Sequence, residues 1–167
     1  MSYRIHQNIK LEKFTDIDFA VYFELVKNIK VMQMITERAL TLEEAHSEFS
    51  KILSKNAYDV ALGNYKIIDA QTHEFMGLAK IELDQPIART AELGYMLLPE
   101  YWVKGIASQV VAFLIDHAKK QPHLTHLMAI IDPENIPSRK ILINNGFHSK
   151  EFKDFDGLAG EILLLSL

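Results

Sequence analysis

Apolar and polar residues alternate along several short stretches of the chain, and these stretches predict β-strands. Alternation with a period of two places one face of a strand toward a core and the other toward solvent. It occurs first in the sequence IKLEKF, at residues 9–14. Six further predicted strands cover residues 57–69, 74–83, 90–98, 124–131, 147–155 and 160–166.

Other stretches carry apolar residues three and four positions apart, which is the spacing of an amphipathic helix. Thr41 and Glu44 have capping-box spacing, in which each side chain satisfies a free backbone N–H of the other residue. An Asn-Gly-Phe sequence ends the last helix at Gly146, where a left-handed residue is expected. The predicted helices cover residues 18–28, 42–54, 105–119 and 136–145.

The predicted elements follow the order βααβββαβαββ along the chain. Strands joined by short turns favour antiparallel pairs, whereas a strand–helix–strand segment favours a parallel step. We therefore predict an α/β sandwich of α+β character, with a mixed central sheet of about seven strands and helices on both faces. No repeat or flexible linker interrupts residues 1–167, which predicts a single domain.

Composition and charge narrow the class of protein. The chain has no cysteine, which excludes disulfides, thiolate metal sites and a cysteine nucleophile. The formal net charge is −4 with no basic tail, so neither a nucleic-acid nor a membrane partner is expected. The apolar runs are far shorter than a membrane span, and the N-terminus lacks a hydrophobic signal segment. These features predict a cytoplasmic protein.

The segment from Pro99 to Ser108 connects a predicted strand to a helix and indicates a phosphate site. The first N–H groups of a helix have no intrahelical acceptor and carry the positive end of the helix dipole. Gly105 lets the backbone approach a ligand, and Lys104 adds a positive charge. Many helices begin after a glycine without binding anything, so this loop alone leaves the question open.

The next strand-to-helix connection carries Asn135 and Ser138. The Asn135 side chain is suited to cap the helix, and Pro137 suits its first turn because proline has no backbone N–H to lose. Capping by itself would explain Asn135. Ser138 is equally compatible with a structural role and with ligand binding.

Together the two segments resemble the GNAT superfamily of acyl-CoA-dependent N-acetyltransferases. The family's pyrophosphate loop reads Q/R-x-x-G-x-G/A, and residues 102–107 (WVKGIA) match it except for Trp102 in the first position. A Y-W-x-K-G-I-A loop followed by N-x-x-S and a Gly-Phe pair is similar to the branch that acetylates ribosomal-protein N-termini. The matching positions are Asn135, Ser138, Gly146 and Phe147.

The resemblance implies acetyl-CoA as the cosubstrate, held in a gap between two diverging strands, and no metal. Its pantetheine arm would pair with free backbone groups of a strand near Met96, Leu97 and Leu98. Its pyrophosphate would lie on the backbone amides of Lys104, Gly105, Ile106, Ala107 and Ser108. Asn135 and Ser138 would contact the pantetheine arm and its sulfur end, with Arg139 and Lys140 as further candidates for the phosphates.

The resemblance also implies direct attack of a neutral amine on the thioester. Glu92 is the first candidate for the general base, through a water molecule, and Glu161 is the second. The alternation around Glu92 leaves open which face of the strand it occupies. A backbone amide near Leu97 would meet the oxyanion. In many relatives a tyrosine acts as the general acid toward the departing thiolate, but this chain has Leu142 at that position. Ser138 is therefore the candidate hydrogen-bond donor to the thiolate.

The implied acceptor is a primary amine, and we favour a protein or peptide N-terminus. Two alternatives stay open: a small-molecule acetyltransferase acting on a polyamine, amino acid or antibiotic, and a noncatalytic acyl-CoA-binding module. His123 and His126 are spaced to point to opposite sides of a strand, which disfavours a metal site. We expect a monomer or homodimer. Residues that either line the acceptor groove or pack in the core are Tyr22, Phe23, Met32 and Met34.

Overall fold

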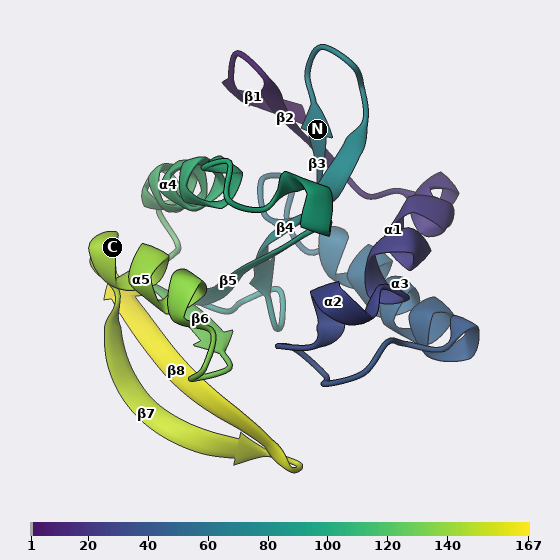
Figure 1. The fold of residues 1–167 in the computed structure, drawn as a ribbon. Helices are drawn as coiled ribbons and strands as arrows, with labels where there is room; N and C mark the ends of the chain where they lie inside the picture. The colour runs from purple at the N-terminus through teal and green to yellow at the C-terminus, as the bar shows by residue number, and fades with distance from the viewer. Residues whose placement is uncertain (1) are drawn as a thin grey trace.

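A computed structural model describes residues 2–167, which form one mixed β-sheet with helices on both faces (Figure 1). The eight strands are β1 (Ser2–His6), β2 (Ile9–Lys13), β3 (Gly63–Asp69), β4 (Phe75–Leu83), β5 (Thr90–Leu97), β6 (His126–Ile131), β7 (His148–Phe155) and β8 (Leu158–Ser166). The helices are α1 (Phe19–Val26), α2 (Ile29–Met32), α3 (Leu42–Asn56), α4 (Ile106–Lys119) and α5 (Ile136–Asn144). None of the helices described is long and apolar enough to cross a membrane.

The strand order across the sheet is β1-β2-β3-β4-β5-β6-β8-β7. Neighbouring strands are antiparallel except β5 and β6, which are parallel and are connected through α4. The predicted mixed sheet with one parallel step is therefore confirmed. This parallel pair lies in the middle of the sheet, so any separation of its strands opens the centre of the molecule.

Two hydrophobic cores cover the two faces of the sheet. On one face, Leu25 of α1 and Phe49 of α3 pack with Leu78 of β4. On the other face, α4 and α5 pack against the sheet through a core that includes Leu114 and Leu142. Figure 1 shows α1, α2 and α3 grouped on one side of the sheet, away from α4 and α5. The prediction of helices on both faces is confirmed.

The predicted count of seven strands is one short, because β1 was not predicted. Its side chains are at most half-buried, so its sequence carries little hydrophobic signal. The strand forms by backbone pairing with β2, and Tyr3 packs against Tyr65 and Phe113, which are distant in sequence. The single-turn helix α2 was also not predicted, since four residues are too few to show a helical period. Asn28 caps that turn by accepting hydrogen bonds from two backbone N–H groups.

Candidate active site

The strands β5 and β6 separate partway along their length. Their pairing covers only Thr90, Ala91 and Glu92 of β5, whereas β5 stays paired with β4 as far as Leu97. A cleft of about 1360 Å³ opens beyond this point. It is lined by the second half of β5, by α2 and the loop that follows it, and by the N-terminal ends of α4 and α5.

Within the splayed part of β5, alternate residues direct their backbone groups to opposite edges of the strand. The N–H of Leu98 donates to Met76 O of β4 at 2.9 Å, and its carbonyl accepts from Tyr101 N at 2.9 Å. The carbonyl of Met96 lies against Gly77 of β4, where a Cβ added to the glycine would be only 2.0 Å from the oxygen. The backbone of Leu97 therefore faces the opposite edge, toward the cleft.

Trp102 holds the loop after β5 against the strand. Its indole Nε1 donates to Leu97 O at 2.8 Å. This hydrogen bond occupies a carbonyl on the edge of β5 that faces the cleft. The next residue, Val103, is fully exposed and has a positive φ of 58°, which is unusual for a β-branched residue. The tryptophan that departs from the family motif therefore anchors a tightly turned loop at the mouth of the cleft.

Helix α4 begins at the end of this loop. Gly105 is its N-cap residue, with a left-handed φ of 77° and no side chain to cap the helix. The amides of Ile106, Ala107 and Ser108 thus have no N-cap side chain to which they can donate, and all three residues line the cleft. Lys104 lies beside them, with its Nζ 5.8 Å from the centre of the Tyr101 ring. The arrangement is suited to bind an anion.

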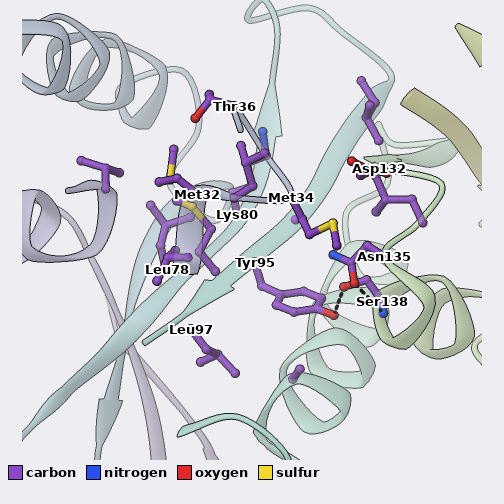
Figure 2. A pocket seen from close by; sticks show the side chains of 18 of the residues that line it. Met32, Met34, Thr36, Leu78, Lys80, Tyr95, Leu97, Asp132, Asn135 and Ser138 are labelled. Carbon is purple, nitrogen blue, oxygen red and sulfur yellow. Dashed lines mark hydrogen bonds between the residues drawn. The ribbon is translucent and has the colours of Figure 1, made fainter. Parts of the chain in front are cut away.

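The N-terminal end of α5 reaches the same cleft. Asn135 caps this helix, because its side-chain oxygen accepts from Ser138 N at 3.3 Å. Ser138 is buried, and its Oγ lies 2.6 Å from the hydroxyl of Tyr95, which extends from β5 (Figure 2). Burial raises the pKa of the Tyr95 phenol despite the opposing effect of this hydrogen bond, so Tyr95 is protonated at neutral pH. The tyrosine was not identified from the sequence.

Glu92 lies at the point where β5 and β6 separate, and it lines the cleft. Its Cα pairs with that of Glu82 on β4, so both side chains lie on one face of the sheet. Lys80 Nζ is 2.9 Å from Glu92 and 3.6 Å from Glu82. Lys55 of α3, 3.0 Å from Glu82, shows that this is the face that α3 covers. The structure thus places the Glu92 side chain on the face covered by α3, which the alternation in the sequence left open.

Glu161, the second candidate for the general base, has a structural role in the fold. It is fully buried in β8, and both its carboxylate oxygens accept from Arg139 Nε, at 2.8 and 3.0 Å. It is not among the residues that line the cleft. The pair joins α5 to β8, so it holds in place the helix that carries Ser138. Arg139 is thereby directed toward β8 through this bond.

Replacing Arg139 with methionine should lower stability, because it leaves Glu161 charged and without its partner inside the protein. The arginine is half-exposed, so we expect a loss of about 2 kcal/mol, or roughly 4–8 °C in Tm for a domain of this size. Thermal unfolding would measure the change. Lys140→Met is the matched control, since that cation is exposed on the same helix and should leave Tm within about 1 °C. Equal Tm values for the two variants would contradict the structural role.

Other residues singled out from the sequence take different places. Leu142 is buried at the edge of the cleft, and as a leucine it offers no hydroxyl there. Tyr22, Met32 and Met34 all line the cleft; Met34 is exposed there, whereas Tyr22 and Met32 are also buried in the adjoining core, against which Phe23 packs. His123 lies 3.5 Å from Asp59, and His126 contacts Ser166 and Thr125. No group of three metal-ligating side chains is found in residues 2–167.

The cleft thus combines a split central sheet with a helix N-terminus at its opening. The profile of the acetyltransferase (GNAT) domain matches residues 8–148. The chain belongs to the GNAT acetyltransferase family. The predicted family is confirmed, and acetyl-CoA is the cosubstrate, as predicted.

Individual relatives agree with this assignment. An N-acetyltransferase of Bacillus licheniformis, itself named uncharacterised, is 34% identical over 101 residues, which cover 59% of this chain and 56% of that protein. The aligned segment thus spans little more than half of that relative. A Salmonella typhimurium acetyltransferase that modifies the N-terminal serine of ribosomal protein L7/L12 has the same fold, with a TM-score of 0.79, 16% identity and coverage of 100% and 98%. The spermidine N-acetyltransferase of Vibrio cholerae, solved with CoA and spermine, gives a TM-score of 0.78, 19% identity and 96% coverage of both chains.

Proposed function

We propose that this N-acetyltransferase acts on the α-amine of a protein or peptide N-terminus. The observation that carries the proposal is one cleft that joins an anion-binding helix end, a hydroxyl pair and a carboxylate at the split between β5 and β6. Acetyl-CoA supplies the thioester carbonyl that the amine attacks. The remaining tasks, which are to hold the cosubstrate, take a proton and stabilise charge, fall to residues of the chain.

The free first-turn amides of α4 fit the pyrophosphate of acetyl-CoA. In this proposal the pyrophosphate lies on the amides of Ile106, Ala107 and Ser108, next to Gly105 and Lys104. The pantetheine arm follows the open edge of β5, where the backbone of Leu97 faces the cleft. Met96 contributes its side chain, which lines the cleft. Leu98 contributes no free backbone group, because both its N–H and its carbonyl are bonded within the chain.

Glu92 is the proposed general base, acting on the amine through a water molecule. Its carboxylate lines the cleft and lies 2.9 Å from Lys80 Nζ. Ser138 is the proposed hydrogen-bond donor to the departing sulfur, and the N–H of Leu97 is the proposed donor to the oxyanion. Asn135 contributes by capping α5, which holds Ser138 at the cleft.

More than half of the carboxylates that line the cleft are paired with cations, which favours an acceptor with one amine over a polyamine. Four of the seven have cationic partners: Glu44 with Arg38, Glu48 with Lys51, Glu82 with Lys55, and Glu92 with Lys80, whereas Glu37, Asp132 and Glu134 form no salt bridge within residues 2–167. A polyamine carries several positive charges and binds best where carboxylates are free. The lining also includes the exposed apolar side chains of Met34 and Ile35, which suit the first side chains of a peptide.

An α-amine also matches the chemistry of the proposed base. Deprotonating an amine of pKa near 8 at pH 7 costs about 1 kcal/mol, whereas a lysine side chain costs about 4.6 kcal/mol. A carboxylate is a weak base, and a weak base is sufficient only for the first of these. The activity named for the Salmonella typhimurium neighbour, modification of an N-terminal serine, supports the same acceptor class.

Release of the CoA thiol in the presence of acetyl-CoA and a panel of acceptors tests the proposal. Peptides with free N-termini and varied first residues should support release, with kcat/KM at least about tenfold above that for spermidine. The same peptides acetylated at the N-terminus but containing a lysine are the matched control and should support none. Release with spermidine or small amines but not with peptides would contradict the proposed acceptor. Cosubstrate binding with no release by any amine would indicate a noncatalytic module.

A further inference from the structure

The hydroxyl of Tyr95 and the Oγ of Ser138 lie 2.6 Å apart, although the residues are 43 positions apart in sequence. Tyr95 extends from the splayed part of β5, and Ser138 lies in the first turn of α5 (Figure 2). Their hydrogen bond therefore crosses the gap beyond the last paired residues of β5 and β6. Both side chains line the cleft.

The surroundings restrict what each hydroxyl can do. The backbone N–H of Ser138 is already bonded to Asn135, so the Ser138 side chain is not needed to cap the helix. Each hydroxyl carries one hydrogen and can also accept. If Tyr95 gives its hydrogen to Ser138, the Ser138 hydrogen is free for a third group. If Ser138 gives its hydrogen to Tyr95, serine has no donor left for the cleft.

We propose that Tyr95 is a positioning residue, which donates its hydrogen bond to Ser138 and thereby directs the Ser138 hydrogen toward the sulfur that leaves as CoA thiolate. This inference rests on the proposed donor role of Ser138. As the carbon–sulfur bond breaks, its electron pair moves to sulfur, and the acetyl carbon keeps its new bond to the amine nitrogen. The amine proton goes to the base, while Ser138 and Tyr95 keep theirs.

The order of acidities supports hydrogen bonding without proton transfer. A thiol has a pKa near 8.5, and a phenol has a pKa near 10. Burial raises the pKa of Tyr95 further, so a thiolate does not remove its proton. A hydrogen bond donated to an anion is also stronger than one between neutral groups, and it strengthens as charge develops on sulfur. The Tyr95–Ser138 pair thus stabilises the leaving group and remains neutral.

Tyr95→Phe tests the proposal, because it removes the hydroxyl and retains the ring. We expect kcat with the best acceptor of the panel to fall about tenfold, with KM for acetyl-CoA within about twofold of the wild type. The kcat of Ser138→Ala should fall by at least the same factor. The double variant should lose no more than Ser138→Ala alone, because Tyr95 acts only through the serine.

A second readout does not depend on turnover. A thiolate absorbs ultraviolet light more strongly than a thiol, so the thiol pKa of bound CoA can be titrated in the complex. We expect the thiol pKa of bound CoA to be about one unit higher in Tyr95→Phe and in Ser138→Ala than in the wild-type complex. Tyr65→Phe is the matched control, since its hydroxyl bonds Ala61 O at 2.8 Å in a buried site away from the cleft. It should alter neither kcat nor the thiol pKa.

The outcomes separate this inference from the proposed function. A loss in Ser138→Ala together with wild-type kcat and wild-type thiol pKa in Tyr95→Phe would overturn the role of Tyr95 alone. If the two single-variant effects on kcat were fully additive in the double variant, this would also overturn it, because Tyr95 and Ser138 would then act independently. Wild-type kcat in Ser138→Ala would remove the donor role on which the inference rests. An acceptor other than a peptide would change the proposed function and leave the test of Tyr95 intact.

Discussion

Gly105→Asp is expected to weaken acetyl-CoA binding more than 100-fold while the protein stays folded. The added carboxylate would lie at the N-terminus of α4, where it repels the pyrophosphate. It would also accept hydrogen bonds from the free first-turn amides, as a natural N-cap does, and so occupy the donors that the phosphates need. A Cβ at this position makes only an ordinary van der Waals contact, with Gln109 Nε2 at 3.8 Å. Isothermal titration calorimetry with acetyl-CoA measures the loss.

Two matched variants separate charge from backbone strain. Gly105→Asn has nearly the same shape as the aspartate variant and tolerates the left-handed φ of 77°, so it should weaken binding only about tenfold. Gly157→Asp places the same side chain at another left-handed glycine, with φ 93° and open space around it, in the turn between β7 and β8. It should bind acetyl-CoA like the wild type. Binding by Gly105→Asp within about threefold of the wild type would show that the pyrophosphate lies elsewhere.

Glu92→Gln is expected to lower kcat/KM about 100-fold at pH 6.5, because it removes the proposed base and keeps the side-chain shape. The loss should shrink toward pH 9, where an α-amine of pKa near 8 is already mostly neutral. Affinity for acetyl-CoA should stay within about twofold, since Glu92 lies away from the phosphate end of the cleft. The measurement is the ratio of wild-type to variant rates between pH 6.5 and pH 9. A constant ratio would exclude Glu92 as the base.

Glu82→Gln controls for the charge network that Glu92 shares through Lys80. Burial raises the pKa of Glu82, but Lys80, Asn64 and Lys55 outweigh it and lower the pKa below its usual 4.5. The ionised carboxylate therefore stabilises the fold at neutral pH, and this contribution disappears as the pH falls below 4.5. Glu82→Gln should lower the free energy of unfolding near pH 7, with a smaller difference near pH 4. Its rate ratio to the wild type should not depend on pH between 6.5 and 9.

Local patterns predicted most of the fold because each long element carries its own periodicity. The strands from residue 9 onward, the three longer helices α3, α4 and α5, and the parallel step were all predictable in this way. The helix start at Gly105 and the cap at Asn135 were equally local, since glycine conformation and side-chain capping act within one turn. Of the elements that were missed, β1 depends on pairing with β2, and α2 is too short to show a helical period.

The candidate site was predictable only in part. The sequence placed Gly105, Asn135 and Ser138 at helix starts, and the resemblance to the GNAT family predicted that they bind acetyl-CoA. It could not separate Glu92 from Glu161, because both are single carboxylates in apolar strands. The difference arises from packing: Glu161 is fully buried against Arg139, whereas Glu92 lies where two strands separate.

The sequence by itself determined the order of elements, the helix start that can bind phosphate and the family to which the chain belongs, since all three depend on spacings within short segments. The tertiary structure alone decided that Tyr95 meets Ser138, that Trp102 occupies the carbonyl of Leu97, and that Lys80 pairs with Glu92. The first of these contacts joins residues far apart in the chain, and it crosses the gap where β5 and β6 separate. That separation depends on the packing of the whole sheet and its two cores, so it cannot be predicted from any short segment of the sequence.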